Sequence, residues 1–357
     1  MRSAQTTQHH SSTDAAPAEV YWGCSRVRRD PPTAPVVRPA CKQPSPLRDC
    51  RMCKARSVIT ILSAPTNLGL RPPAKGSVPG ASKAPEALRE AGLYRRLAAT
   101  GAIDDGVVLP GRYVDDDASR VHGHVRNETA MIEHARRLSR RIARIISGGR
   151  APLVLGGDCS ILLAAGLALA PQRDNGLIHI DGHTDFRHPG NSSECASVAG
   201  EDLAAAVGLH WPAIADIDDL GPYFQPANSV HIGHRDNDAD AFEAKQVLSL
   251  VFPARRIIEI GMAQAASTAS AQAGARYWLH IDVDILDPTF MPAVDSPDPG
   301  GLNPHQLIEL LALLAPCATG ADVTVFDPDL DPDGRYAQVL SDVISAGLAD
   351  LGSALTH

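Results

Sequence analysis

The sequence predicts an α/β protein, a three-layer α-β-α sandwich in which helices cover both faces of a mostly parallel central sheet. Three observations support this prediction. From residue 57 onward, short apolar runs alternate with longer stretches whose apolar residues recur at helical spacing. Runs such as Leu177-Ile-His-Ile180 lack the alternation of a strand with one wet face, so they are expected to be buried on both faces. The chain has 357 residues, 44% of them hydrophobic, which is enough for a large core.

The individual elements follow from these runs. Strands are predicted at 57–63, 106–110, 152–156, 176–181, 229–233, 256–260, 276–284 and 321–327. The clearest helix is Glu128 to Ser147, where apolar residues fall close to helical spacing at Met131, Ile132, Ala135, Leu138, Ile142 and Ile145. Similar spacing favours helices at 303–315 and 335–350.

Residues 1–51 differ in composition from the rest of the chain. They contain seven prolines between Pro17 and Pro46, no periodic apolar pattern, and a net charge of +4 within a total of −8. A segment with so little apolar surface cannot offset the entropy of ordering. We therefore expect a disordered Pro/Arg-rich tail over 1–51 and one folded domain over 52–357.

Composition also indicates which kinds of partner and which cellular location to expect. The first thirty residues contain no apolar signal core, and the apolar stretch Ile161 to Ala170 is about half of what a bilayer crossing needs. The basic tail only weakly suggests nucleic-acid binding, because the folded part is acidic. The sequence therefore predicts a cytoplasmic protein that binds neither nucleic acid nor membrane.

Acidic clusters follow three of the predicted strands. They are Gly156-Gly-Asp-Cys-Ser160, Asp181-Gly-His-Thr-Asp185 and Asp282-Val-Asp-Ile-Leu-Asp287. The carboxyl ends of parallel strands share one edge of the sheet, where such proteins bind their ligands. The three clusters are therefore expected to meet.

These clusters have the composition of a metal centre. Residues two apart on a strand share a face, so Asp181, His183 and Asp185 would face one point if the chain stays extended, as would Asp282 and Asp284. Packed carboxylates repel one another, and their burial is tolerable when they coordinate cations. Each motif alone also fits a solvated turn or a helix cap. Together they favour two divalent ions, and oxygen-rich ligands with an imidazole suit Mn²⁺.

The same residues resemble the ureohydrolase family of arginases and agmatinases. The three acidic clusters look like the metal-binding signatures of that family, in its order and spacing. Ala64-Pro-Thr-Asn-Leu-Gly69 resembles its first strand and loop, Ile232-Gly-His-Arg-Asp236 its central strand, and Pro297-Asp-Pro-Gly-Gly301 its glycine loop. The similarity spans roughly 57–352, so the chain is identified as a divergent arginase-like member with its catalytic domain over 52–357.

The resemblance implies a binuclear manganese hydrolase that releases urea from a guanidino compound, in an oligomer that is often a trimer or hexamer. A hydroxide bridging the two ions would attack the guanidinium carbon, and Asp284 would pass a proton to the leaving amine. His183 and Asp284 are thus the expected catalytic residues. The implied metal ligands are Cys159, Asp181, Asp185 and Asp282 for one ion, and His183, Asp181, Asp282 and Asp284 for the other.

Three positions depart from the family pattern. Cys159 stands where the family has His, so Zn²⁺, Ni²⁺ or Fe²⁺ is an alternative to Mn²⁺, and an inert buried thiol is another interpretation. Ala199 and Val325 stand where the family has a proton-shuttling His and a guanidinium-binding Glu. The stand-ins considered are His188, Glu194 and Cys195 for the first, and Asp327, Asp329 and Asp331 for the second.

The sequence leaves several alternatives for the substrate. Asn191 and Ser193 lie in the loop that holds the α-carboxylate in arginases, and Asp236 and Asp238 are placed to hold an amino group, although each also fits a loop-capping role. L-Arginine is the leading substrate. Alternatives are agmatine, hydroxyarginine, a guanidino acid and formimidoylglutamate. A catalytically silent metal-binding homologue is the alternative from another class, whereas a single-zinc deacetylase is disfavoured by the second Asp pair, Asp282 and Asp284.

Overall fold

The computed structural model describes residues 58–355, so the predicted tail lies outside the described residues. An eight-stranded sheet runs through the described part, in the order β2-β1-β3-β8-β7-β4-β5-β6, and every strand pairing is parallel. The predicted fold class is confirmed. The strands are β1 Ile59–Ala64, β2 Ile103–Val107, β3 Ala151–Gly156, β4 Gly176–Ile180, β5 Ser229–Ile232, β6 Leu250–Phe252, β7 Tyr277–Asp282 and β8 Ala318–Thr324.

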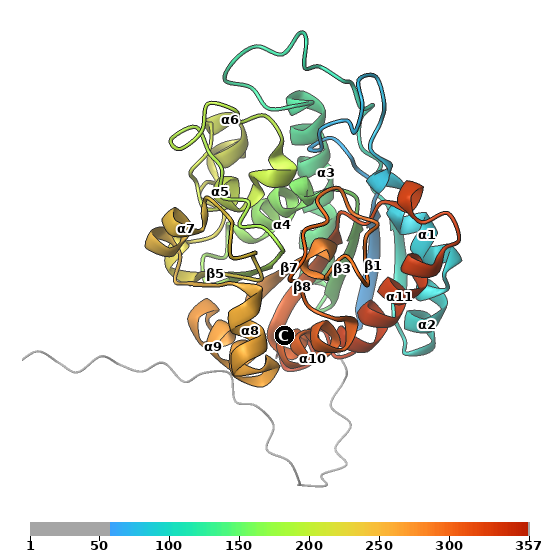
Figure 1. Cartoon of the computed structure of the whole chain (residues 1–357). Helices are drawn as coiled ribbons and strands as arrows, with labels where there is room; N and C mark the ends of the chain where they lie inside the picture. The colour runs from blue at the N-terminus through green and yellow to red at the C-terminus, as the bar shows by residue number, and fades with distance from the viewer. Residues whose placement is uncertain (1–57, 356–357) are drawn as a thin grey trace, which may run out of the picture. The chain divides into compact units, whose positions relative to one another are not determined.

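Helices form a layer on each face of this sheet (Figure 1). Two separate clusters of buried apolar side chains fill the space between the sheet and the two helical layers. One layer contains α3 Glu128–Ser147, α4 Leu162–Leu169, α5 Asp202–Ala206, α6 Pro212–Ala215 and α7 Ala241–Val247. The other contains α1 Ala84–Glu90, α2 Leu93–Ala99, α8 Ala254–Ile260, α9 Met262–Ala273, α10 Pro304–Leu314 and α11 Arg335–Gly347.

The central strands are buried on both faces, as their unbroken apolar runs predict. Every residue of β3, β4, β7 and β8 is buried, whereas the edge strand β2 is largely exposed. Helix α3 has the predicted bounds, and α10 and α11 lie within the predicted ranges. No helix within residues 58–355 combines the length and the apolar character that a bilayer crossing requires.

One predicted strand is wrong, and the predicted strand 106–110 shares only residues 106 and 107 with β2. Residues 256–260 belong to helix α8, and the edge strand is instead the short β6 just before it. Pro253 is the N-cap of the helix, and Arg255 pairs with Glu259 one turn later at 2.7 Å. Ile257 is buried while Ile258 is exposed, so the apolar run at this point belongs to a helix with one buried face.

Helix α3 carries a buried histidine that links stability to pH. His134 is 2% exposed, its Nε2 donates to the carbonyl oxygen of Val108 at 3.0 Å, and burial lowers the pKa of His134 from 6.5 to about 4. The unfolded chain therefore binds a proton between pH 6.5 and 4 that the folded chain does not. The stability that depends on this neutral imidazole is present above pH 6.5 and is lost as pH falls towards 4.

The variant His134→Gln tests this linkage, because the amide keeps a donor for Val108 and has no titrating group. We expect the wild-type free energy of unfolding to fall more steeply between pH 6.5 and 4 than that of the variant, by on the order of 3 kcal/mol in total. Urea unfolding at closely spaced pH values, with a metal chelator present throughout, measures the difference. Parallel curves for the two proteins would contradict the assignment.

Candidate metal centre

The three acidic clusters lie at the carboxyl ends of β3, β4 and β7. Strands β3 and β4 are consecutive in the chain, but β8 and β7 lie between them in the sheet. The connection from β3 therefore crosses to the other half of the sheet, and such a crossing leaves a crevice at the strand ends. The topology thus brings together residues that are more than a hundred positions apart in the sequence.

Cys159 begins a short 3-10 helix that follows β3. Asp158 caps this helix by accepting the backbone N–H of Ser160 at 2.9 Å. The Cys159 thiol donates to Oδ2 of Asp282 at 2.9 Å and lies 3.2 Å from Oγ1 of Thr324. Burial, followed by the charge of Asp282, raises the pKa of Cys159 well above its ordinary value. The thiol becomes a ligand only when a cation displaces its proton.

The chain does not stay extended after β4. Asp181 follows the strand directly, and its Oδ1 accepts the backbone N–H of His183 at 2.7 Å. Asp185 has a φ of 46°, in the left-handed region, so the backbone turns here. The ligand-type atoms of Asp181 and Asp185 lie within 4.8 Å of each other and of the sulfur of Cys159, while Nδ1 of His183 lies 3.9 Å from Oδ1 of Asp181.

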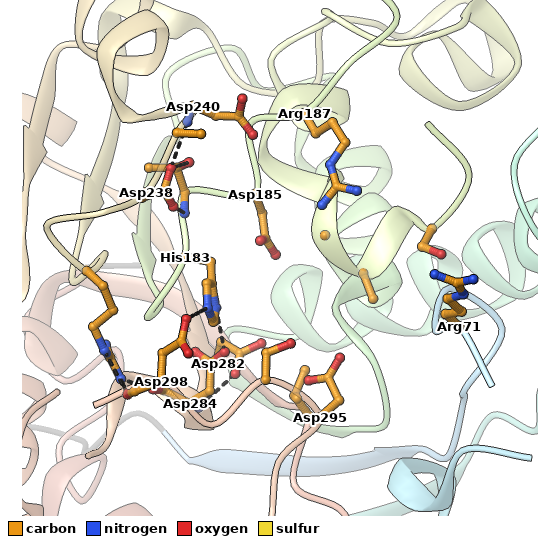
Figure 2. A pocket seen from close by; sticks show the side chains of 18 of the residues that line it. Arg71, His183, Asp185, Arg187, Asp238, Asp240, Asp282, Asp284, Asp295 and Asp298 are labelled. Carbon is orange, nitrogen blue, oxygen red and sulfur yellow. Dashed lines mark hydrogen bonds and ion pairs between the residues drawn. The ribbon is translucent and has the colours of Figure 1, made fainter. Parts of the chain in front are cut away.

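His183 pairs with Asp284 instead (Figure 2). Its Nδ1 lies 2.8 Å from Oδ2 of Asp284, and its Nε2 lies 3.3 Å from Oδ2 of Asp298. Burial lowers the pKa of His183, but Asp284 outweighs this effect and raises the pKa to about 10. Burial likewise raises the pKa of Asp284, but the hydrogen bond and charge of His183 hold it below its ordinary value. The two residues form an ion pair.

The remaining carboxylates are crowded. Burial, and then repulsion from neighbouring carboxylates, raises the pKa of Asp181, Asp185 and Asp282 well above the ordinary value. Oδ2 of Asp181 is buried and has no hydrogen-bond partner within residues 58–355. A divalent cation would relieve the repulsion and satisfy this oxygen. The donor set of carboxylates with an imidazole and a thiol therefore fits a divalent-metal centre.

A cavity of about 410 Å³ opens onto these residues (Figure 2). Asp298 and Asp295, from the loop after β7, add carboxylates to its wall. A wall of this charge attracts a cationic substrate. The members of the acidic clusters that line the cavity are His183, Asp185, Asp282 and Asp284.

Three arginines line the same cavity, Arg71, Arg187 and Arg235, and sequence reasoning gave no role to the first two. Figure 2 shows the side chains of Arg187 and Arg71 among those that line the cavity. Within residues 58–355 the guanidinium of Arg187 has no hydrogen-bond or ion-pair partner, and that of Arg71 lies 4.0 Å from Asp117. Arg187 lies two residues after Asp185, the last residue of the second acidic cluster. This position is the one sequence signal that indicates it.

The four predicted substrate residues are not brought together. Asn191 lies outside the cavity wall, where its side chain bonds the backbone of His188 and Phe186 and the carboxylate of Glu243. Ser193 lines a neighbouring cavity of about 590 Å³.

Of the two predicted aspartates, one faces the cavity. Asp236 points outward into an ion pair with Arg255 at 2.9 Å. Asp238 lines the cavity, and its two oxygens accept the backbone N–H and the hydroxyl of Thr184, both at 2.7 Å. Asp238 therefore orders the loop after β4.

The departures Ala199 and Val325 both lie in the cavity wall. Val325 is buried, with a φ of 73°, a left-handed conformation that is costly for a β-branched residue. This left-handed conformation follows directly after Thr324, the last residue of β8, and explains why the strand stops earlier than predicted. None of the considered stand-ins lines this cavity; they are His188, Glu194, Cys195, Asp327, Asp329 and Asp331.

Comparisons with known proteins agree with this geometry. The profile of the Arginase family matches residues 58–348. An arginase of Brevibacillus brevis is 31% identical over 284 residues, covering 76% of this chain and 93% of that protein. A guanidinopropionase of Pseudomonas aeruginosa is 28% identical over 60% of this chain and 64% of its own length.

Solved arginase structures have the same fold as this chain. The arginase from Bacillus caldovelox has a TM-score of 0.73 and 26% identity, covering 82% of this chain and 98% of its own. The residues that the family profile matches include all eight strands and the acidic clusters that follow three of them. The chain therefore belongs to the arginase family, whose members are hydrolases acting on amidino carbon–nitrogen bonds.

Proposed function

We propose that the chain is a metal-dependent amidinohydrolase that cleaves a small guanidino compound to an amine and urea. One observation carries the proposal, namely the buried carboxylate cluster at the floor of the cavity in a chain of this family. Two divalent ions, Mn²⁺ or alternatively Zn²⁺, Ni²⁺ or Fe²⁺, would supply Lewis acidity and a water of lowered pKa. The proposed ligands are Cys159, Asp181, Asp185 and Asp282 for one ion, and His183, Asp181, Asp282 and Asp284 for the other.

The residues around the cavity would position the reaction. Arg235 donates from Nη2 to the carbonyl oxygen of Asp284 at 2.7 Å, and Gly182 donates its backbone N–H to Oδ1 at 2.9 Å. With Oδ1 held by Gly182, Oδ2 of Asp284 faces His183. We propose that Oδ2 takes the proton of the attacking water and returns it to the leaving amine nitrogen, and that the contact with Nδ1 of His183 keeps Asp284 oriented for both transfers.

The two ends of the cavity favour a substrate with a cation and a carboxylate. The acidic floor suits an amidinium or guanidinium group. Arg187, which has no partner within residues 58–355, suits a carboxylate by a bidentate contact. L-Arginine carries both groups and is the leading candidate, followed by hydroxyarginine and shorter guanidino acids, consistent with relatives named arginase and guanidinopropionase. Formimidoylglutamate also carries both charges, whereas agmatine lacks the carboxylate.

A catalytically silent, metal-binding homologue is the second candidate. It is favoured by Ala199 and Val325, which leave two positions of the cavity wall without a polar group. The two candidates differ in turnover and not in metal binding.

A substrate panel tests the proposed function. The purified protein is loaded with Mn²⁺ or Zn²⁺, and urea release is measured from arginine, hydroxyarginine, agmatine and shorter guanidino acids, with formamide release measured from formimidoylglutamate. We expect urea from at least one guanidino compound that bears a carboxylate. Bound metal without any product from the whole panel would reject the proposal in favour of the silent homologue.

The variant Arg187→Ala tests the proposed substrate class. We expect the KM for the best carboxylate-bearing substrate to rise roughly tenfold to a hundredfold, because a charged hydrogen bond contributes about 1.5–3 kcal/mol. The kcat should change much less. Arg137→Ala, an exposed arginine of α3, is the matched control and should leave the KM unchanged. An unchanged KM in Arg187→Ala would remove the carboxylate from the proposal.

A further inference from the structure

A second layer of polar side chains lies directly below the carboxylate cluster. His179 of β4 and His280 of β7 are paired in register, and each precedes a cluster aspartate, Asp181 or Asp282, by two residues on the same face of its strand. Both imidazoles are fully buried and stack with their centroids 4.6 Å apart. Asp202, which begins α5, is also fully buried and reaches the same point from the helical layer.

The polar atoms of this layer converge without forming hydrogen bonds. Nε2 of His280 lies 3.5 Å from Oδ2 of Asp202. Nε2 of His179 lies 3.6 Å from Oδ1 of Asp202 and 3.6 Å from Oδ2 of Asp181. Within residues 58–355 none of these buried atoms has a hydrogen-bond partner. Such groups are rarely left unsatisfied in native proteins, so this layer requires a partner that the described chain does not supply.

Each imidazole is held in place through its other ring nitrogen. Nδ1 of His280 lies 2.5 Å from Oδ1 of Asp322, and Oδ2 of Asp322 accepts the indole N–H of Trp278 at 2.5 Å. Nδ1 of His179 lies 2.9 Å from Nδ1 of His231. A histidine that binds a metal typically uses one nitrogen for the ion and bonds the other to a carboxylate or another polar group. Both imidazoles have this arrangement, with Nε2 left for a ligand.

The spacing of the converging atoms matches a metal-ligand set. Four ligands at bond lengths of about 2.0–2.1 Å around a tetrahedral zinc lie roughly 3.3 Å apart, close to the separations found here. Hydrogen bonds of the N–H···O type are shorter, at about 2.9–3.0 Å. Ligand-type atoms of His179, Asp181 and His280 lie within 4.8 Å of one another, as do those of Cys159, Asp202 and His280.

We propose that a divalent cation binds in this deeper layer, with Nε2 of His179, Nε2 of His280, the carboxylate of Asp202 and Oδ2 of Asp181 as its ligands. We call this the inner site. Two imidazoles with two carboxylates favour Zn²⁺ over Mn²⁺.

The inner site adjoins the ligand set of the proposed function, because ligand-type atoms of Asp202 lie within 4.8 Å of those of Cys159 and Asp185. His179, His280 and Asp202 belong to neither of the two proposed ion sites, and Asp181 is the one residue shared with them. The inference goes beyond the proposed function, because it concerns which metal the chain holds and where, and needs no substrate.

Zinc binding by the full-length protein tests the inner site. The protein is stripped with a chelator and titrated with Zn²⁺ against a chromogenic chelator, and bound zinc is counted by elemental analysis. Asp202→Asn keeps the side-chain volume, and we expect it to weaken the tightest zinc site on the order of 100-fold or more. Asp240→Asn, a carboxylate of the cavity wall outside the inner site, should bind zinc as the wild type does.

Cobalt spectroscopy provides an independent measurement. Co²⁺ in a four-coordinate site gives intense visible absorption, which we expect in the wild type and in Asp284→Asn but not in His280→Gln. Circular dichroism confirms that each variant is folded. The inner site would be overturned if Asp202→Asn and His280→Gln both kept the zinc affinity and the cobalt spectrum of the wild type. It would also be overturned if the wild-type protein bound no zinc.

These outcomes are distinguishable from failure of the proposed function. A protein that holds zinc at the inner site but releases no product from the substrate panel would support this inference and reject the function. If the wild-type protein releases urea while Asp202→Asn and His280→Gln bind zinc as the wild type does, the proposed function is supported and the inner site is rejected.

Discussion

The variant Asp282→Ala is expected to lose the metal bound by the carboxylate cluster and to lower kcat by about a thousandfold or more. Oδ1 of Asp282 accepts the backbone N–H of Asp284 at 2.8 Å, while Oδ2 faces the thiol of Cys159 at 2.9 Å. Asp282 therefore lies between the two halves of the carboxylate cluster and is a proposed ligand of both ions. A catalytic metal contributes several kcal/mol to the transition state, and each 1.36 kcal/mol is a factor of ten in rate.

Elemental analysis and product release, measured on the same folded preparation, check this prediction. Asp218→Asn is the matched control, because that aspartate is exposed and pairs with Arg136 on the surface. The control should keep wild-type metal content and kcat. Unchanged metal content in Asp282→Ala would show that the carboxylate cluster is not the metal centre.

The variant Arg235→Ala is expected to give the largest loss of stability. The guanidinium is buried at 4% exposure and donates to the carbonyl oxygens of Gly233, Asp284, Leu286 and Asp298, at 2.7–3.4 Å. It thereby ties the end of β5 to the loop after β7 that carries two cavity aspartates. Removing it leaves several buried carbonyls unpaired, which costs roughly 3–5 kcal/mol of unfolding free energy.

Thermal unfolding of metal-free protein measures the effect without the stabilisation that bound metal adds. A loss of that size corresponds to a fall in Tm of roughly 6–20 °C. Arg255→Ala is the control, because its pairs with Asp236 and Glu259 are exposed to solvent and contribute little to stability. Equal Tm values for the two variants would mean that the buried hydrogen bonds of Arg235 do not hold this edge together.

Local patterns predicted the sheet and the acidic edge correctly. The buried strands have unbroken apolar runs, and the acidic clusters follow three of them directly, so parallel topology was sufficient to bring these clusters to one edge. The helix α8 was mistaken for a strand because Ile257, Ile258 and Ile260 form a short apolar run. Short runs of this kind do not distinguish a strand from a helix, and the Arg255 to Glu259 pair was the signal that did.

The deeper polar layer was missed although part of it was visible. His179 and His280 each precede a cluster aspartate by two residues, and that period places them on the same strand faces. Asp202 and Arg187 could not be placed in this way, because their positions depend on the turn at Asp185 and on how α5 packs against the sheet. Tertiary packing, and not local pattern, decides which loop residues reach the cavity.

The dependence of activity on metal loading tests the central claim most directly. Metal-free protein is titrated with Mn²⁺ or Zn²⁺, and product release from the best guanidino substrate is measured against metal bound per chain. The account predicts no activity without metal and a rise in activity as the carboxylate cluster fills. Full activity in the metal-free protein, or no activity at any loading with any substrate, would contradict a metal-dependent amidinohydrolase.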